Sequence, residues 1–166
     1  VVTDRPGGGH ERGIRSGTPD VAGACALATA LEYAAAHRLE RVQRAEELRR
    51  RLLAGLPSGV RLTVDPHAAS AAIIHLMIPT HHPEAVLLAM DMAGVDVSAG
   101  SACHAGVSRP SRIVMELGYG ENQALGVLRV STGIETQAAD IDAFLSALPA
   151  AIRAGQALDE REGTVA

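Results

Sequence analysis

A helical pattern of apolar residues runs from Val21 to Leu56. Apolar positions three, four and seven residues apart lie on one face of an α-helix, and this spacing is kept along the whole stretch. Thr18 is a suitable N-cap and Pro19 suits the first helical position, so we expect the helix to begin at about Pro19. A single helix of this length either bridges two structural units or breaks near His37.

Shorter apolar runs follow, with helical patterns between them. The runs at residues 60–64, 71–78, 95–97 and 126–132 are expected to be strands. Helices are expected at 84–92, 110–117, 121–125 and 137–154, and the polar tail after Gly155 is expected to fray. Strands alternating with helices predict an α/β fold, namely a two-layer sandwich of a small sheet and helices over residues 57–154, preceded by a long helix.

The segment before the first helix differs in character from the rest of the chain. Between Pro6 and Pro19 it carries five glycines and two arginines and almost no apolar surface. Such a segment cannot form an element of its own, and we interpret it as an extended loop that lies against something else. We therefore expect residues 1–36 to be a remnant of another unit and residues 37–166 to form one small domain.

Composition restricts the class of protein. Apolar residues make up 47 % of the chain, but only two Tyr and one Phe are present, so the core is built from Ala, Val, Leu and Ile. The net charge of −4 with no basic block argues against nucleic acid and anionic membranes as partners. No apolar run approaches the roughly 20 residues needed to span a bilayer. Two cysteines make no disulfide framework, and a reducing, cytoplasmic setting is expected.

All fifteen of the basic Lys and Arg residues are arginines. The chain therefore lacks the amine that a Schiff base, a lysine phosphate contact or a lysine general base requires. Any mechanism that depends on such an amine cannot be completed by these residues.

Cys103 lies in a run of small residues that follows a short apolar strand. Gly100 and Gly106 flank it at equal distance, and His104 is the one bulky neighbour. A reactive thiolate needs access and neighbours that favour its ionised form, whereas an inert cysteine usually sits among large apolar side chains. Two readings stay open from this stretch alone, a reactive thiol and a surface loop that merely contains a cysteine.

Two further residues are candidates for anion binding. Alternation along the last strand places Arg129 on the face opposite Leu128, where its guanidinium is either solvated, paired in a salt bridge, or a bidentate clamp for a substrate carboxylate. Thr18 follows a glycine-rich loop at a helix start, which suits a phosphate, although a simple N-cap explains it as well.

The remaining candidate ligands do not indicate a metal site. Their spacing matches no ligand pattern, and the residues concerned are His75, His81, His82, Cys103 and His104. We interpret His75 as a strand residue and the pair His81 and His82 as a solvated loop. Cys25, within the Ala-rich helix, is interpreted as a small core residue.

Four motifs together resemble those of the pyridoxal-phosphate-dependent cysteine desulfurases, of the class V aminotransferase superfamily and fold type I. They are Gly7 to Thr18, Ser98-Ala-Gly-Ser-Ala-Cys103, Pro110-Ser111 and Leu128-Arg-Val-Ser131. The glycine-flanked Ser-Ala-Cys version resembles the branch that supplies sulfur for iron–sulfur cluster assembly and tRNA thiolation. The resemblance implies that this chain is the C-terminal part of such an enzyme, with residues 1–36 from its large cofactor-binding domain.

The resemblance also implies a role for individual residues. Cys103 is the nucleophile that takes sulfur from L-cysteine, leaving L-alanine and a persulfide for transfer to an acceptor or scaffold protein. Arg129 binds the substrate carboxylate, and Thr18 reaches across a homodimer to the phosphate of the partner's pyridoxal 5'-phosphate.

The sequence departs from the family pattern in three places. The family's Schiff-base lysine precedes the glycine-rich segment and is absent here, so this chain alone is expected to be inactive. His104 stands where a small hydroxyl residue is common, and Ile134 where a basic residue often occurs. A non-catalytic persulfide carrier or interaction domain is the alternative, and the Cys103 loop disfavours a related lyase or aminotransferase.

Overall fold

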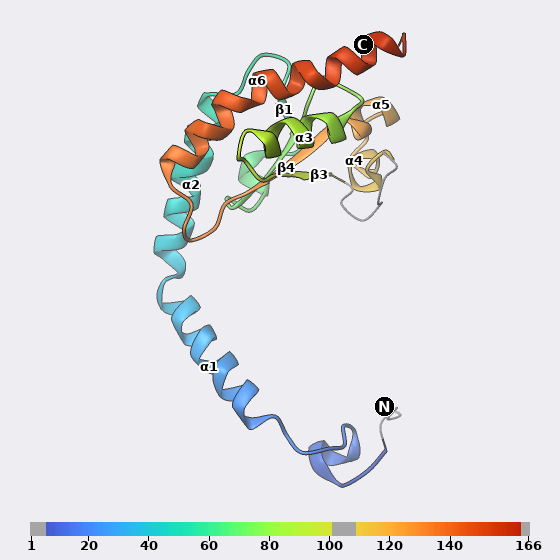
Figure 1. The fold of residues 1–166 in the computed structure, drawn as a ribbon. Helices are drawn as coiled ribbons and strands as arrows, with labels where there is room; N and C mark the ends of the chain where they lie inside the picture. Colours follow the sequence, from blue (N-terminus) through green and yellow to red (C-terminus); the bar gives the residue numbers. More distant parts are fainter. Residues whose placement is uncertain (1–5, 101–108, 164–166) are drawn as a thin grey trace. The chain divides into compact units, whose positions relative to one another are not determined.

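The computed structural model describes residues 6–100 and 109–163, and the chain divides into two compact units (Figure 1). The first unit extends to Glu40 and the second begins at Arg41. The second unit contains the sheet and all of the buried core. In the described residues, no helix is both long and apolar enough to cross a membrane.

The first unit consists of a short 3-10 helix and one α-helix. The 3-10 helix η1 spans His10–Gly13, and α1 spans Val21–Ala36. The prediction of Thr18 as the N-cap is wrong by two residues, because the carboxylate of Asp20 accepts a hydrogen bond from the Gly23 backbone N–H. No residue of α1 is buried, and Cys25 is exposed, so the interpretation of Cys25 as a core residue is also wrong.

The long helical pattern breaks at His37, as the sequence predicts. The helix α2 begins immediately afterwards and spans Arg38–Ala54. The His37 backbone N–H donates to the Tyr33 carbonyl, and its ring nitrogen Nδ1 lies 2.8 Å from the same oxygen. The last two turns of α2 enter the core of the second unit through Leu48 and Leu52.

The second unit is built on a four-stranded antiparallel sheet in the order β1-β2-β4-β3. Its strands are β1 (Arg61–Leu62), β2 (Ile73–Met77), β3 (Ser98–Ala99) and β4 (Val127–Ser131). A second 3-10 helix, η2 (Pro66–Ala68), lies between β1 and β2. The third strand was expected at residues 95–97, but β3 begins at Ser98, directly after that range.

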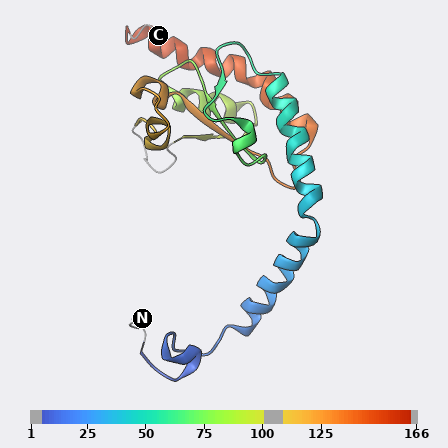
Figure 2. The same ribbon diagram turned by 180° about the vertical axis from the view of Figure 1, so that it is seen from behind.

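Helices cover one face of this sheet and part of the other. The main core joins the sheet to α2, α3 (Pro83–Met92) and α6 (Ala138–Arg161) through residues such as Leu76, Leu128 and Phe144. A smaller cluster on the opposite face joins Met77 and Val127 to α4 (Arg112–Glu116) and α5 (Glu121–Leu125). Figures 1 and 2 show α4 and α5 at the end of the sheet away from α2. The predicted two-layer α/β architecture is therefore confirmed.

The last helix is longer than its predicted end at residue 154. It continues to Arg161, and both Gly155 and Asp159 are buried within its final turns. A Cβ atom at Gly155 would lie 2.7 Å from the Thr80 hydroxyl, so the helix packs directly on the loop that follows β2. The segment after Gly155 was expected to fray because it is polar, but its packing against the rest of the second unit keeps it helical.

Gly126 is the second close contact of this loop and generates a stability prediction. A Cβ atom there would lie 2.5 Å from the Ile78 carbonyl oxygen, which belongs to backbone that cannot move aside. We expect Gly126→Ala to lower the free energy of unfolding by about 1–3 kcal/mol, the usual cost of overpacking. Gly133→Ala is the matched control because no atom lies within 4 Å of its added Cβ. Urea unfolding of the two variants checks this, and equal losses would contradict it.

Candidate functional site

A row of polar residues crosses the sheet on the face opposite the main core. Ser98 pairs with Arg129, Arg129 pairs with His75, and the backbone of Thr63 bonds to that of His75. Residues opposite one another in an antiparallel sheet project from the same face. The register therefore brings together four polar side chains from four parts of the chain, of which Thr63 is buried and Arg129 is exposed.

Thr63 holds the His75 ring in one orientation. Its hydroxyl lies 3.0 Å from the ring nitrogen Nδ1 and 3.3 Å from the His75 carbonyl oxygen. Thr63 itself is buried, and its carbonyl accepts a hydrogen bond of 3.0 Å from the Tyr119 hydroxyl. These contacts fix the ring from one side and leave Nε2 as its free nitrogen.

The environment of His75 favours the neutral imidazole. Burial of the half-buried ring lowers the His75 pKa, and the positive charge of Arg129 lowers it further. His75 is thus an uncharged ring beside a permanent cation at neutral pH.

Arg129 projects from the face that the sequence predicts. Leu128 is fully buried on one side of β4, and Arg129 is exposed on the other. None of the described residues forms an ion pair with the Arg129 guanidinium. Of the three readings of this arginine, a salt bridge within the described chain is excluded, and the guanidinium is available to a ligand.

The segment that leads to Cys103 begins beside Arg129. Ser98 and Ala99 pair with β4, and the Gly100 backbone N–H donates to the Val127 carbonyl at 3.1 Å. A Cβ atom at Gly100 would overlap the Val127 side chain, so only glycine fits there. Cys103 and His104 lie outside the described residues.

Thr18 lies in the first unit, and Arg129 lies in the second. Thr18 is exposed, and its carbonyl accepts a hydrogen bond of 3.3 Å from the Arg15 guanidinium. Sequence reasoning missed the contributions of Thr63 and His75. Alternation along each strand indicates the face on which a residue lies, but no sequence signal gives the register that brings His75 opposite Arg129.

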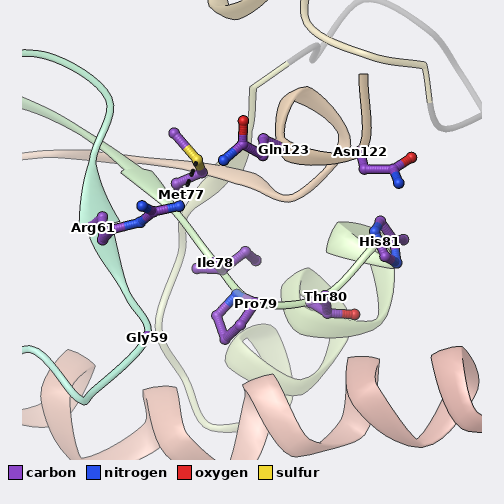
Figure 3. Close-up of a pocket in the computed structure, with 9 residues that line it drawn as sticks. All are labelled: Gly59, Arg61, Met77, Ile78, Pro79, Thr80, His81, Asn122 and Gln123. Atoms are coloured by element: carbon purple, nitrogen blue, oxygen red, sulfur yellow. Dashed lines mark hydrogen bonds between the residues drawn. The ribbon is translucent and has the colours of Figure 1, made fainter. Parts of the chain in front are cut away.

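A separate pocket of about 380 Å³ lies at the other end of β2 (Figure 3). It lies between the Arg61 side chain and the loop that carries Thr80 and His81, with Asn122 and Gln123 on a third side. It contains none of the residues predicted for the site.

His81 and His82 are held by carboxylates, contrary to their interpretation as a solvated loop. Asp159 accepts from the His81 backbone N–H at 3.1 Å and lies 3.1 Å from its ring nitrogen Nδ1. His82 lies 3.1 Å from Glu84 and 3.4 Å from Glu162. Within residues 6–100 and 109–163, no group of three or more His, Cys, Asp or Glu side chains is arranged to hold a metal ion.

A protein-family model matches most of this chain. The model of the class-V aminotransferases matches residues 8–144, which include the glycine-rich segment, the polar row and most of the second unit. The chain belongs to the aminotransferase class-V family. Its match spans both units of the structure.

Two relatives that match most of this chain are named as cysteine desulfurases. The chain is 39 % identical over 150 residues to an IscS-like cysteine desulfurase of Mycobacterium tuberculosis, an alignment of 88 % of this chain and 38 % of that protein. It is 34 % identical over 153 residues to a cysteine desulfurase IscS of Clostridium botulinum, with 89 % and 38 % covered. The chain therefore spans somewhat over a third of the length of these relatives.

Solved structures support the class-V fold. A NifS-like protein of Rickettsia africae matches with a TM-score of 0.77 and 23 % identity, over 92 % of this chain and 40 % of that one. A second NifS-like protein matches with a TM-score of 0.73 and 23 % identity, over 96 % and 39 %. At this identity the likeness shows the fold alone.

The donor set of this chain does not complete a site for the pyridoxal phosphate that the family implies. The Schiff base of that cofactor requires a lysine, and the chain has none. The exposed Thr18 is a candidate for the phosphate and Arg129 for a substrate carboxylate, but neither holds the cofactor covalently. No step through the cofactor is derived from these residues.

Asp159 generates a prediction about how α6 is held. Burial raises the pKa of its carboxyl, but hydrogen bonds from Thr80 and His81 outweigh this and lower the pKa overall. We expect Asp159→Asn to lower the free energy of unfolding at pH 7 by about 1–3 kcal/mol, because the partners lose a charged acceptor. The difference from the unmodified protein should shrink as pH falls through the depressed pKa, where the carboxyl becomes protonated.

The matched control for this prediction is Asp142→Asn on the same helix. Asp142 pairs with Arg51 in an ion pair whose side chains are half exposed, so its loss should cost less. Urea unfolding at pH 7 and at a pH below the depressed pKa of Asp159 compares the variants. A larger loss for Asp142→Asn, or no pH dependence for Asp159→Asn, would contradict the assignment.

Proposed function

We propose that this chain is the C-terminal part of a cysteine desulfurase that transfers sulfur from L-cysteine to Cys103. The observation that carries the proposal is the position of Arg129, which has no ion-pair partner among the described residues and lies one strand away from the start of the Cys103 segment. A carboxylate receptor and a thiol on adjoining parts of the fold suit an amino-acid substrate whose side chain carries sulfur.

The overall reaction balances with these participants. L-Cysteine and the Cys103 thiol give L-alanine and a Cys103 persulfide, so the carbon–sulfur bond of the substrate breaks and a sulfur–sulfur bond forms. The cofactor, when bound by the complete enzyme, supplies electron withdrawal from the amino acid. Cys103 acts as the thiolate, which is the nucleophilic form of a cysteine.

Arg129 binds and orients the substrate in this proposal. Its planar guanidinium offers two parallel N–H donors to a carboxylate, which sets the direction of the amino acid. Thr18 contacts the cofactor phosphate through its exposed hydroxyl, and by family resemblance does so across a homodimer.

The persulfide then passes to another protein. The relatives are named as cysteine desulfurases of the IscS kind. From the motif resemblance we infer a cytoplasmic enzyme that delivers sulfur for iron–sulfur cluster assembly. The acceptor or scaffold protein must approach Cys103, because the bound sulfur moves by attack of the acceptor's own thiolate on the persulfide.

A non-catalytic persulfide carrier is the second candidate function. A carrier needs no cofactor, so it requires only the Cys103 thiol of this chain. The exposed Arg129 disfavours it, since a protein that only accepts sulfur has no need of a carboxylate receptor.

The two candidates predict different results for Cys103 in the complete protein that contains these residues. For the desulfurase, Cys103→Ser abolishes both alanine formation and the mass increase of one sulfur atom at this position, while Cys25→Ser, the matched control, leaves both unchanged. Chromatographic assay of alanine and mass spectrometry measure the outcome. A persulfide on Cys103 that forms only when a separate desulfurase is added would show the carrier instead.

Arg129 has its own prediction in the complete protein. Arg129→Gln removes a charged hydrogen-bonding contact worth about 1.5–3 kcal/mol, which corresponds to a KM for cysteine raised roughly ten- to a hundredfold. The control is Arg61→Gln, an exposed arginine in the next row of the sheet, whose KM should stay near that of the unmodified enzyme. Equal effects of the two substitutions on KM would rule out a specific carboxylate receptor.

A further inference from the structure

His75 and Arg129 are a directly opposed pair in the β2–β4 ladder. Their side chains project from the same face, where opposed Cβ atoms in antiparallel strands are about 4.5–5.5 Å apart. Arg129 is close enough for its charge to lower the His75 pKa, in addition to the larger effect of burial. The two side chains therefore share one electrostatic environment.

Among the described residues, this pair has no anion of its own. None of the ion pairs there includes His75 or Arg129, and the charge that lowers the His75 pKa is that of Arg129. The neighbours of the ring are uncharged, namely Thr63, which directly follows β1, and Ser98 one strand beyond Arg129. A cation beside a neutral donor ring, with no carboxylate between them, is complementary to an anion from outside the described chain.

The His75 ring is also oriented for such a contact. The Thr63 hydroxyl has one proton and two acceptors within reach, His75 Nδ1 at 3.0 Å and the His75 carbonyl oxygen at 3.3 Å. Donation to the nearer acceptor, Nδ1, leaves the proton of the neutral ring on Nε2, and the protonated ring carries an N–H at Nε2 in either case. Nε2 lies 3.4 Å from the point that a Cβ atom of Gly100 would occupy. The backbone of Gly100 therefore borders this edge of the ring.

We propose that His75 is a second carboxylate-binding residue beside Arg129, with Nε2–H donating to the carboxylate that the guanidinium holds. The inference rests on the proposed function only for the identity of that carboxylate as L-cysteine. It assigns a ligand contact to a residue that neither the motifs nor the family resemblance singled out.

The His75–Arg129 pairing makes the contribution of His75 to carboxylate binding depend on pH. A bound carboxylate offsets the Arg129 charge at His75, so the ring takes up a proton from solvent more readily in the complex than in the free protein. By linkage, the contribution of His75 to binding is largest at low pH and declines as pH rises. A glutamine at this position keeps a donor but does not titrate.

Solution NMR tests the juxtaposition in this chain without any turnover. The His75 ring resonance, assigned by its loss in His75→Gln, is titrated in the unmodified chain and in Arg129→Gln. We expect the titration midpoint of His75 at higher pH in Arg129→Gln, while the half-exposed Arg51→Gln leaves it unchanged. Equal midpoints in the unmodified chain and Arg129→Gln would overturn the pairing.

Steady-state kinetics of the complete enzyme test the ligand contact. His75→Leu should raise the KM for cysteine about tenfold and leave kcat within about twofold, and His75→Gln should retain most of the affinity. The ratio of the KM of His75→Gln to that of the unmodified enzyme should fall as pH rises from 6 to 8.5. An unchanged KM for His75→Leu, a fall in kcat alone, or a KM ratio independent of pH would overturn the proposal.

These experiments separate the inference from the proposed function. If the complete unmodified enzyme forms no alanine from cysteine, the proposed function fails. The NMR comparison still tests the His75–Arg129 pairing on which the inference rests, because it requires only this chain and no substrate.

Discussion

The pairing register of β2 with β4 is the constraint on which the site depends. Side chains alternate between the faces of a sheet, and a shift of one residue would exchange the two faces completely. Leu76 and Leu128 must face the helices because they are fully buried in the main core. His75 and Arg129, which alternate with them, are therefore held on the opposite face. The hydrophobic core thus sets the position of the polar row without contacting it.

The rest of the second unit keeps this sheet rigid around the row. Tyr119 binds the Thr63 carbonyl, and Thr63 orients the His75 ring, so the connection between α4 and α5 reaches the site through two hydrogen bonds. At the far end of β2, Gly126 and Gly155 allow close packing on the loop at Thr80. The segment that leads to Cys103 begins at Gly100, so the start of this segment and Arg129 are both positioned by the same strand, β4.

The sequence predicted the architecture well and the local contacts poorly. Periodicity found the helices and strands, the break at His37 and the exposed face of Arg129, because each depends on the spacing of apolar residues. It failed where tertiary contacts override local signals. Asp159 is buried against His81, which extends α6 past its expected end, and the Asp20 carboxylate caps α1 in place of Thr18. The role of His75 was not predictable, because register with Arg129 is a property of the folded sheet.

The central claim is that the open face of this sheet receives the carboxylate of an amino acid. A crystal structure of the complete protein with L-alanine bound tests it most directly. The account predicts the alanine carboxylate paired with the Arg129 guanidinium and within hydrogen-bond distance of His75 Nε2. A carboxylate held by other residues, with Arg129 paired to an acidic side chain of the protein, would contradict it.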